Sequence, residues 1–378
     1  MTVNFTGGAE GGEMLVSTVI DNVIERLDQR KDAGGMTRQR ITIGEVARAA
    51  GVSVATVSKV INNRYGVAEE TAARVRSVIE HLGYESSLVA QSLRRRRTNV
   101  IGVLLWDFEP FGTELLKGAA QAIRGSGYEL VVYSGGGLGH TQHGWERRYV
   151  SRISGLTDGA ILVTPTVLDL PFHSPVVAVD PPPGASPTPA VDSDNWSGAR
   201  LATEYLLGLG HRRIGFLAGR SDLESARLRE QGFREALAAA GIPLDDELVR
   251  VGSYNVEDAE PAAREILTHP RPPTAVFAAN DTMAMTTSRV AATLGLRVPD
   301  DLSVVGFDNV PESALNEPPL TTVEQPIQRM GYEAVCMLIA LIAGQPIENP
   351  HVTLPTKLIV RQSCRALDPP GPETGTMK

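Results

Sequence analysis

Small and hydrogen-bonding side chains share one side of a predicted helix between residues 54 and 62. On its other side, Val57, Val60 and Ile61 recur at helical spacing and predict a buried face. A small, polar helix surface fits the major groove of DNA. There an ammonium can bind guanine, a small apolar group can contact a thymine methyl, and hydroxyl or amide groups can reach phosphates or base edges. The side chains placed for these contacts are Val54, Ala55, Thr56, Ser58, Lys59 and Asn62.

The residues before this helix have the types and spacing needed to position it. Thr42 stands three residues before Glu45, which is the spacing of a capping box at the start of a first helix. Gly51 permits a sharp turn, and Ser53 is placed to cap the second helix, predicted from Val54 to about Asn62. With a third helix, these segments predict a helix-turn-helix in a compact three-helix unit. Its predicted core residues are Val46, Ala47, Ala50, Val52, Val75, Ile79 and Leu82. A purely structural three-helix module is the alternative interpretation.

A second group of chemically capable residues follows predicted strands: Asp180, the pair Asn280–Asp281 and the pair Asp308–Asn309. Residues at the carboxyl ends of parallel strands face a crevice. Their carboxylates and amides, with Arg229 opening a helix, can hydrogen-bond a polyol, and Phe111 or Tyr254 can stack on its apolar face. A plainer interpretation stays open for each residue alone, since aspartate after a strand often only caps a helix.

The elements that must carry these residues alternate between short apolar segments and helical ones from Val100 onward. This order predicts parallel sheets, and the length of the body favours two similar α/β lobes with a cleft between them. The predicted strands are Ile101–Leu105, Leu130–Tyr133, Ala160–Val163, Val176–Val179, Ile214–Leu217, Ala275–Ala278 and Ser303–Val305. The predicted helices are Thr113–Arg124, Ser197–Leu207, Arg229–Ala239, Glu257–Leu267, Asp281–Leu294 and, as a buried apolar helix, Ala334–Ala343.

Charge is divided unevenly along the chain. Between Thr37 and Asn99, eleven basic residues stand against five acidic ones, a net charge of +6, whereas the whole chain carries −8. The remaining residues therefore carry −14. A small cationic segment on an anionic body is the asymmetry expected of a DNA-binding module joined to another domain.

Composition argues against export and membrane insertion. No apolar run reaches the roughly 18 residues that span a bilayer. Glu10 and Glu13 precede the first apolar stretch, where a secretory signal carries basic residues. Cys336 and Cys364 are too few for a disulfide framework or a zinc site. These observations predict a cytoplasmic protein without a membrane partner.

Catalytic and metal-binding patterns are weak. The run Gly135–Gly137 lacks the following Lys and Ser/Thr of a phosphate-binding loop. His140 and His143 have no evident third ligand, so we expect no metal site. No nucleophile stands beside a base, and we expect neither an enzyme nor a cofactor.

The head has the residue pattern of a known family. Residues 45–47 (Glu-Val-Ala), 51–53 (Gly-Val-Ser) and 56–62 (Thr-Val-Ser-Lys-Val-Ile-Asn) resemble the DNA-binding head of the lactose-repressor/galactose-repressor (LacI/GalR) family. In that family the first, second and sixth residues of the recognition helix read bases, which implies this role for Val54, Ala55 and Lys59. Lys59 stands where arginine is commoner. Thr42 and Ser53 complete the DNA contacts expected in the head.

The resemblance continues into the linker. In the family, a hinge helix forms only on operator DNA, pairs with its dimer mate and inserts a leucine into the minor groove. The corresponding segment here is Leu88–Leu93, and Leu93 is that leucine. Glu85 and Ser86 replace the usual basic-proline pair, and Arg94–Arg97 is more basic than is common. A plain linker with solvated arginines is the alternative interpretation.

The body is similar to the family from Val100 to about Arg365, through residues 110–111, 209–214, 225–227, 279–281, 298–299, 303–308 and 318–323. The resemblance implies a fold like that of periplasmic sugar-binding proteins, in which the chain crosses between lobes near Asp192, Glu324 and Gly344. The implied effector contacts are Phe111, Asp180, Arg229, Asn280 and Asp308, with an aromatic side chain at Tyr254 and with Gln325 close to the ligand.

The combined prediction is an α/β chain with an N-terminal all-α helix-turn-helix head and a two-lobed periplasmic-binding-protein-like body of parallel sheets. It comprises a flexible extension (1–36), the head (37–84), a hinge or linker (85–98), an effector-binding and dimerisation domain (99–366) and a disordered tail (367–378). Within the body, the N-lobe comprises 99–192 and 325–344, and the C-lobe comprises 193–324 and 345–366.

The predicted function is sequence-specific repression. A homodimer would bind palindromic operator DNA at the nucleoid, with its affinity controlled by a small polar effector such as a sugar or sugar derivative. No counterpart of the lactose repressor's tetramer helix follows Arg365, which favours a dimer. The alternatives are an exported solute-binding protein, opposed by the head and the missing signal, and a sugar-processing α/β enzyme, opposed by the missing acid and base. A repressor would lose DNA affinity steeply as salt rises.

Overall fold

The computed structural model describes residues 41–61, 64–82, 97–135, 144–147, 150, 155–172, 174–184 and 186–367. The chain forms two compact units that divide between residues 90 and 91, and each is described by itself. Several predictions lie outside the described residues: the extension 1–36, Asn62, the hinge segment with Leu93, the histidines His140 and His143, and the tail beyond Leu367.

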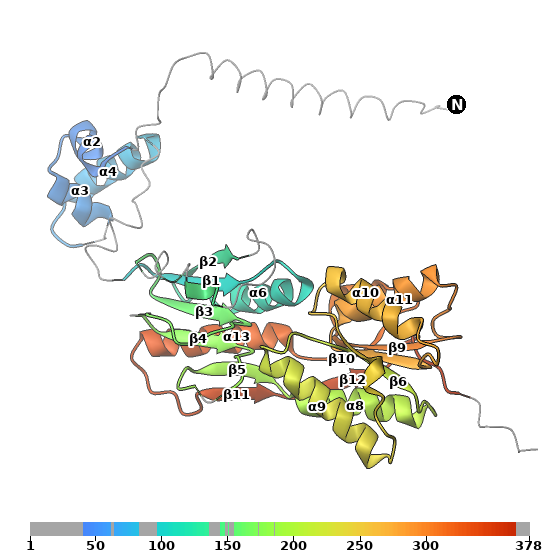
Figure 1. The fold of residues 1–378 in the computed structure, drawn as a ribbon. Coiled ribbons are helices and arrows are strands. Elements are labelled where there is room, and N and C mark those ends of the chain that lie inside the picture. Colours follow the sequence, from blue (N-terminus) through green and yellow to red (C-terminus); the bar gives the residue numbers. More distant parts are fainter. Residues whose placement is uncertain are drawn as a thin grey trace, which may run out of the picture. The chain divides into compact units, whose positions relative to one another are not determined.

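The head contains the three predicted helices, α2 (Ile43–Ala50), α3 (Val54–Ile61) and α4 (Glu69–Leu82) (Figure 1). The predicted capping box at α2 is confirmed. The Glu45 amide donates to the Thr42 hydroxyl (3.4 Å), and the Thr42 amide donates to the Glu45 carboxylate (2.6 Å). Gly51 ends α2 with φ +63, a left-handed conformation that glycine adopts without steric cost.

A small hydrophobic core holds the three head helices together. Val46, Val57 and Val75, one from each helix, are completely buried and lie in one cluster. The predicted core members Ala47 and Ala50 are also buried, and Val52, Ile79 and Leu82 pack around them. On the other side of α3, Val54, Ala55 and Lys59 lie outside this core and are exposed.

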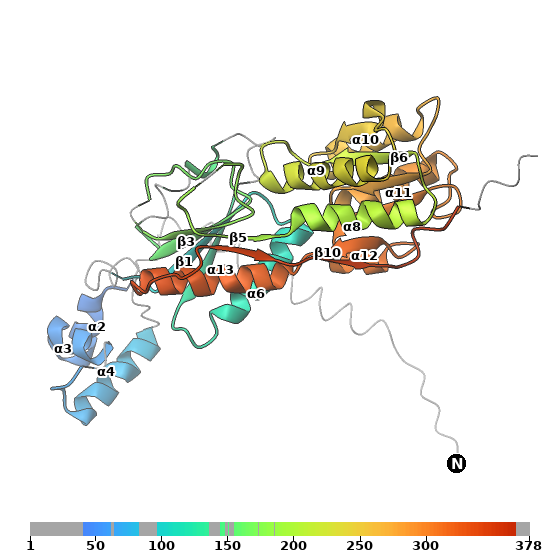
Figure 2. The same ribbon diagram turned by 90° about the horizontal axis from the view of Figure 1, so that it is seen from below.

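The N-lobe of the body is built on a six-stranded parallel sheet in the order β11-β5-β4-β3-β1-β2. Its strands are β1 (Val100–Leu105), β2 (Glu129–Ser134), β3 (Gly159–Val163), β4 (Val176–Val179), β5 (Ala190–Ser193) and β11 (His351–Leu354). Two helices, α6 (Pro110–Ala122) and α13 (Ile327–Ile342), lie side by side on this lobe (Figure 2). They approach closely at Gly118, where a Cβ would lie 1.7 Å from the Gln328 carbonyl oxygen.

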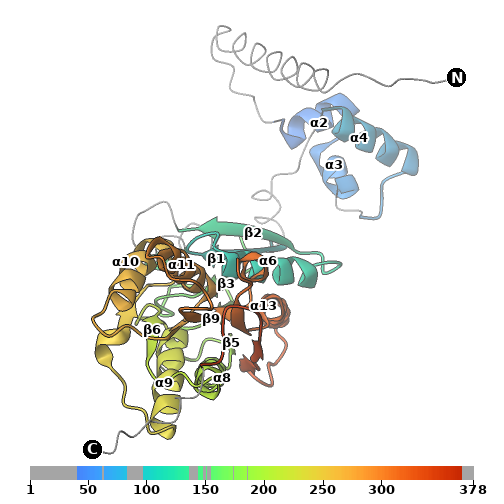
Figure 3. The ribbon, with the colours of Figure 1, turned by 90° about the vertical axis from the view of Figure 1, so that its right-hand side faces the viewer.

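The C-lobe sheet has the order β12-β10-β9-β8-β6-β7, parallel except for the antiparallel edge strand β12. Its strands are β6 (Ile214–Ala218), β7 (Val249–Val251), β8 (Ala275–Ala278), β9 (Ser303–Asp308), β10 (Thr321–Glu324) and β12 (Lys357–Ile359). Helices α8 (Asn195–Gly208) and α9 (Glu224–Ala239) cover one face, and α10 (Val256–Leu267) and α11 (Asp281–Thr293) cover the other (Figure 3). Two short helices complete the lobe, η2 (Asp246–Leu248) and α12 (Pro311–Leu315).

The chain passes between the lobes three times. It leaves β5 for α8 through Asp194, and leaves β10 for α13 through Gln325 and Pro326, close to the predicted crossings near Asp192 and Glu324. The third crossing is a correction. We predicted it near Gly344, but β11 pairs in parallel with β5 of the N-lobe, so the chain crosses only between β11 and β12. Segment 345–354 therefore belongs to the N-lobe.

Seven predicted strands are confirmed, and five strands that we did not predict are present: β5, β7, β10, β11 and β12. Each of the five has three or four residues and includes a polar one, whereas the equally short predicted strands β4 and β8 are wholly apolar. Helix α9 begins at Glu224, so Arg229 lies in its second turn and does not open it as predicted. The reason is that Ser225 and Ala226 are buried and already belong to the packed face of the helix.

Candidate functional site

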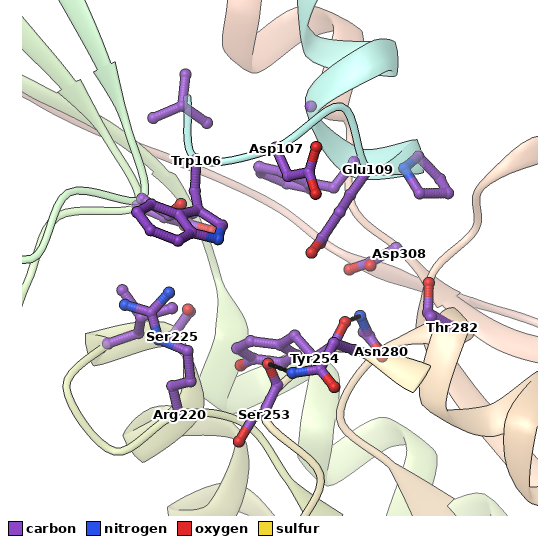
Figure 4. Close-up of a pocket in the computed structure, with 18 of the residues that line it drawn as sticks. Trp106, Asp107, Glu109, Arg220, Ser225, Ser253, Tyr254, Asn280, Thr282 and Asp308 are labelled. Atoms are coloured by element: carbon purple, nitrogen blue, oxygen red, sulfur yellow. Dashed lines mark hydrogen bonds between the residues drawn. The ribbon is translucent and has the colours of Figure 1, made fainter. Parts of the chain in front are cut away.

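A cavity of about 610 Å³ lies between the two lobes, lined from both sides. In Figure 4, Trp106, Asp107 and Glu109 of the N-lobe face Ser253 and Tyr254 across it. The carboxyl ends of β1, β3, β4, β8 and β9 meet at this cavity, as expected for ligand sites in parallel sheets. All seven predicted effector contacts line it: Phe111, Asp180, Arg229, Tyr254, Asn280, Asp308 and Gln325.

Arg229 is buried beneath this cavity and held on several sides. Its Nε donates to Asn195 Oδ1 (2.8 Å) and its Nη1 donates to the Ala279 carbonyl oxygen (2.5 Å). The Asp308 carboxylate lies 3.5 Å from Nη1, and the Phe307 ring stacks under the guanidinium at 3.8 Å. This arrangement pre-orients a cation with little freedom to move.

Asp308 of the C-lobe is connected by hydrogen bonds to segments through which the chain passes between the lobes. Gln325 Nε2 donates to Asp308 Oδ1 (2.6 Å), and Gln325 Oε1 accepts from the Ser193 hydroxyl (2.8 Å) at the end of β5. Burial raises the pKa of Asp308 to about 6, although the Arg229 charge opposes this rise. The ligand-facing carboxylate is thus connected through Gln325 to two of the three segments that link the lobes.

Asp180 lines the cavity and has one carboxylate oxygen without a hydrogen-bond partner in the described part of the chain. It is 4 % exposed, and its Oδ1 has no hydrogen-bond partner among the described residues. Burial raises its pKa to about 7; the Arg229 charge opposes this, and Asp192 and Asp308 add to it. Since a buried polar atom without a partner is unfavourable, this oxygen is available to a ligand donor.

Tyr254 and Asn280 form the C-lobe wall. The Tyr254 ring fills space left by Gly219, where a Cβ would lie 2.1 Å from the ring. Asn280 Nδ2 donates to the Tyr254 carbonyl oxygen (3.2 Å), and Asn280 Oδ1 caps α11 by accepting from the Met283 amide (2.9 Å). Asn280 therefore serves as a helix cap while it also lines the cavity.

Two residues singled out beside these do not line the cavity, which corrects the expectation that they face it. Asp281 is completely buried and accepts from the Val310 amide (2.9 Å) and the Thr322 hydroxyl. Asn309 pairs with Glu324 (2.8 Å) and Arg361 (2.6 Å). Both side chains point back into the C-lobe because they satisfy backbone and charged groups there.

Several lining residues were not predicted: Trp106, Asp107, Glu109, Arg220, Ser225, Ser253, Glu257 and Thr282. Trp106 and Asp107 follow β1 directly, and Arg220 follows β6. A polar residue just beyond a strand was the signal for Asp180 and Asp308, and the same signal marks Asp107 and Arg220, whereas Trp106 does not carry it.

On α3, three of the predicted DNA-reading side chains are exposed. Val54 is 40 % exposed, and Ala55 and Lys59 are exposed. Thr56 and Ser58 are half-buried. Ser53 begins the helix, its hydroxyl accepting from the Thr56 amide (3.1 Å). Thr42 and Ser53 thus have capping roles that the structure describes.

Family comparisons match both parts of this chain. Residues 42–87 match the bacterial regulatory proteins of the lacI family, and residues 203–364 match the periplasmic binding protein-like domain. The HTH-type transcriptional repressor PurR of Photobacterium profundum is 34% identical over 332 residues, covering 86% of this chain and 99% of the relative. The chain belongs to the LacI family of bacterial transcriptional regulators. The HTH-type transcriptional regulator CelR of Thermobifida fusca is 35% identical over 343 residues, with the same coverage.

Solved structures of LacI-family regulators share the fold. The lac repressor dimer bound to operator and the anti-inducer ONPF matches with a TM-score of 0.73 at 28% identity, covering 87% of this chain and all of that one. A CelR–cellobiose complex matches with a TM-score of 0.63 at 33% identity, covering 86% and 100%. These relatives are transcriptional regulators and not enzymes, so the chain is a LacI-family regulator. Within the described ranges, no helix is long and apolar enough to cross a bilayer.

Proposed function

We propose that the protein is a repressor whose operator affinity is controlled by a sugar or sugar derivative bound between the lobes. The main support for this proposal is the cavity of about 610 Å³ between the lobes, a volume within the range of small-molecule sites. Arg229 supplies donors, Asp180 and Asp308 supply acceptors, and Phe111 and Tyr254 supply rings for the apolar face of a sugar. The CelR relative was solved with cellobiose, which agrees with this class of ligand.

The head would read operator DNA through α3. The exposed Val54, Ala55 and Lys59 would contact bases, and Thr56, Ser58 and Asn62 would contact phosphates or base edges. Leu93 would enter the minor groove. Because a palindromic operator presents two half-sites, we infer a homodimer in the cytoplasm, as in the operator-bound lac repressor dimer.

The body offers a physical route from the cavity to the segment that leads toward the head. Helix α13 begins just after Gln325, whose side chain binds Asp308 at the cavity. At the other end of α13, the Ile342 carbonyl accepts from Arg97 (3.2 Å). The next residue, Thr98, donates its amide to Asp158 at the edge of the N-lobe (2.5 Å). A ligand that changes how the lobes meet would thereby alter residues 97–98, and DNA and effector affinities would be coupled reciprocally.

The test is DNA binding by the full chain, measured by footprinting on fragments from its genomic neighbourhood. We expect a short palindromic footprint that weakens steeply with salt and that Leu93→Ala weakens further. Addition of individual sugars should shift operator affinity, and Asp180→Asn should reduce that shift while it leaves ligand-free DNA binding intact. Specific DNA binding that no sugar alters would overturn the effector part alone. Binding without sequence preference would overturn the repressor part.

A further inference from the structure

The cavity is lined by far more acidic than basic side chains. Its carboxylates come from Asp107, Glu109, Asp180, Glu257, Asp258 and Asp308. Arg220 and Arg229 are the basic residues among the described residues that line it. Both arginines already have carboxylate partners, since Arg220 holds Asp222 through two contacts of 3.0 and 2.8 Å and Arg229 lies 3.5 Å from Asp308. The cavity therefore presents excess negative charge to whatever enters it.

Glu109 lies where the negative charge of the two lobes converges. In Figure 4 its side chain extends from the N-lobe into the cavity, toward Asp308 of the C-lobe. Burial raises its pKa to about 7; the carboxylates of Asp107, Asp308 and Glu257 add to this, and Arg220 opposes it. Charged groups of both lobes therefore act on the Glu109 carboxyl, and a ligand that contacts both lobes would lie against it.

Asp180 independently indicates the kind of ligand. Asp180 lines the cavity, and its buried Oδ1 has no hydrogen-bond partner among the described residues, so the ionised carboxylate would be satisfied by a ligand donor. Hydroxyl and ammonium groups are donors. A phosphate or carboxylate group has only acceptors when ionised and would add a like charge in a site of low dielectric constant.

We infer that this pocket selects its effector by charge, accepting uncharged or amine-bearing polyols and excluding phosphorylated or carboxylated ones, with Glu109 as a specificity-determining residue. The inference rests on the proposed function, because it assumes that the pocket is the effector site. Above pH 7, where Glu109 is ionised, an anionic group about 6 Å from its carboxylate loses on the order of a hundredfold in affinity at an effective dielectric constant of 20. The effector would therefore be sensed in its unphosphorylated form.

The experiment uses matched sets of sugars with the full chain. A thermal-shift screen, followed by calorimetry, would compare glucose with glucosamine, glucose 6-phosphate and glucuronate, then the galactose and mannose counterparts, with cellobiose included. We expect ligands only among the uncharged and amino members, with phosphates and uronates bound on the order of a hundredfold more weakly. At pH 8, Glu109→Gln should abolish most of this discrimination, and Glu257→Gln, on an exposed side chain that lines the cavity, should reduce it less.

Glu348→Gln, an exposed carboxylate outside the pocket, is the matched control and should leave the discrimination unchanged. A phosphate or uronate that binds as tightly as its parent sugar would overturn the inference while the effector pocket stands. Unchanged discrimination in both Glu109→Gln and Glu257→Gln, with unaltered melting temperatures, would also overturn it. No binding by any sugar would instead count against the proposed effector site itself, and the charge inference would fall with it.

Discussion

On α3 the three side chains predicted to read bases, Val54, Ala55 and Lys59, are exposed, Val54 to 40 %. In the pocket, Arg229, Asp180 and Asp308 are each 5 % exposed or less. The α3 residues come from one short segment, and their positions depend on a local cap and on a core beneath them. The pocket residues come from several segments spread over more than a hundred positions of the chain and hold one another in place. Substitutions on α3 should therefore change DNA binding without changing stability. Substitutions in the pocket should change both ligand binding and stability.

The largest expected effect is that of Arg229→Ala. Removing the guanidinium leaves Asp308, the Asn195 amide oxygen and the Ala279 carbonyl buried without their cation. This should lower the free energy of unfolding by about 3–5 kcal/mol. Sugar binding should be lost at the same time. Urea unfolding and calorimetry check both, with the exposed Arg271→Ala as the control. Full stability in Arg229→Ala would break the contrast drawn between pocket and α3.

Asp180→Asn tests the burial of the carboxyl. Because the pKa of Asp180 rises from its ordinary 3.8 to about 7 on folding, the folded state binds more protons between these values, and stability falls as pH rises from about 4 to 7. The neutral variant removes this loss, which amounts to at most about 4 kcal/mol. Asparagine also tolerates the left-handed backbone at this position (φ +51). In thermal unfolding across pH 4–8, the difference in melting temperature between variant and parent should widen as pH rises. The control is Asp169→Asn, on an exposed side chain, which should show no such difference.

Lys59→Ala tests the other side of the comparison. Loss of an exposed base-contacting ammonium should weaken specific DNA binding by about 1–3 kcal/mol and relax preference at one base pair. Stability should change by no more than about 0.5 kcal/mol, because the side chain is exposed. Fluorescence anisotropy with operator variants measures DNA binding, and urea unfolding measures stability. Glu80→Gln on α4 is the control. Equal weakening on every sequence would mean that Lys59 contacts phosphate only.

The smallest effect is expected at the helix cap. Thr42→Ala removes the hydroxyl that accepts from the Glu45 amide, and should destabilise α2 by about 1 kcal/mol. Hydrogen exchange in the full chain should then speed up in α2 and not in the C-lobe strands. Ser77→Ala, exposed in the middle of α4, is the control. Unchanged exchange would show that tertiary packing, and not the cap, holds the start of α2.

The difference between local contacts in the head and long-range contacts in the pocket also decides how much can be predicted from sequence. The cap at Thr42, the turn at Gly51 and the buried valines depend on neighbours within a few residues, so their types and spacing suffice to predict them. Asp180 and Asp308 could be predicted because parallel strands end at one edge, even without knowledge of what lies opposite. Glu109 could not, since its surroundings are set by burial and by carboxylates of both lobes, which only the folded chain brings together. The short strand β11 was missed because its place depends on pairing with β5, a relation between distant segments.

The late return of the chain to the N-lobe has a consequence for synthesis. The strand β11 emerges from the ribosome well after β5, its partner, and β12 follows it almost at once. Until residues 351–359 are made, β5 and β10 are both open sheet edges, able to pair with other chains. Both lobes therefore complete their sheets together, within one short segment that is synthesised after all the other strands. A polypeptide that stops at Gly344 would lack an edge strand in each lobe.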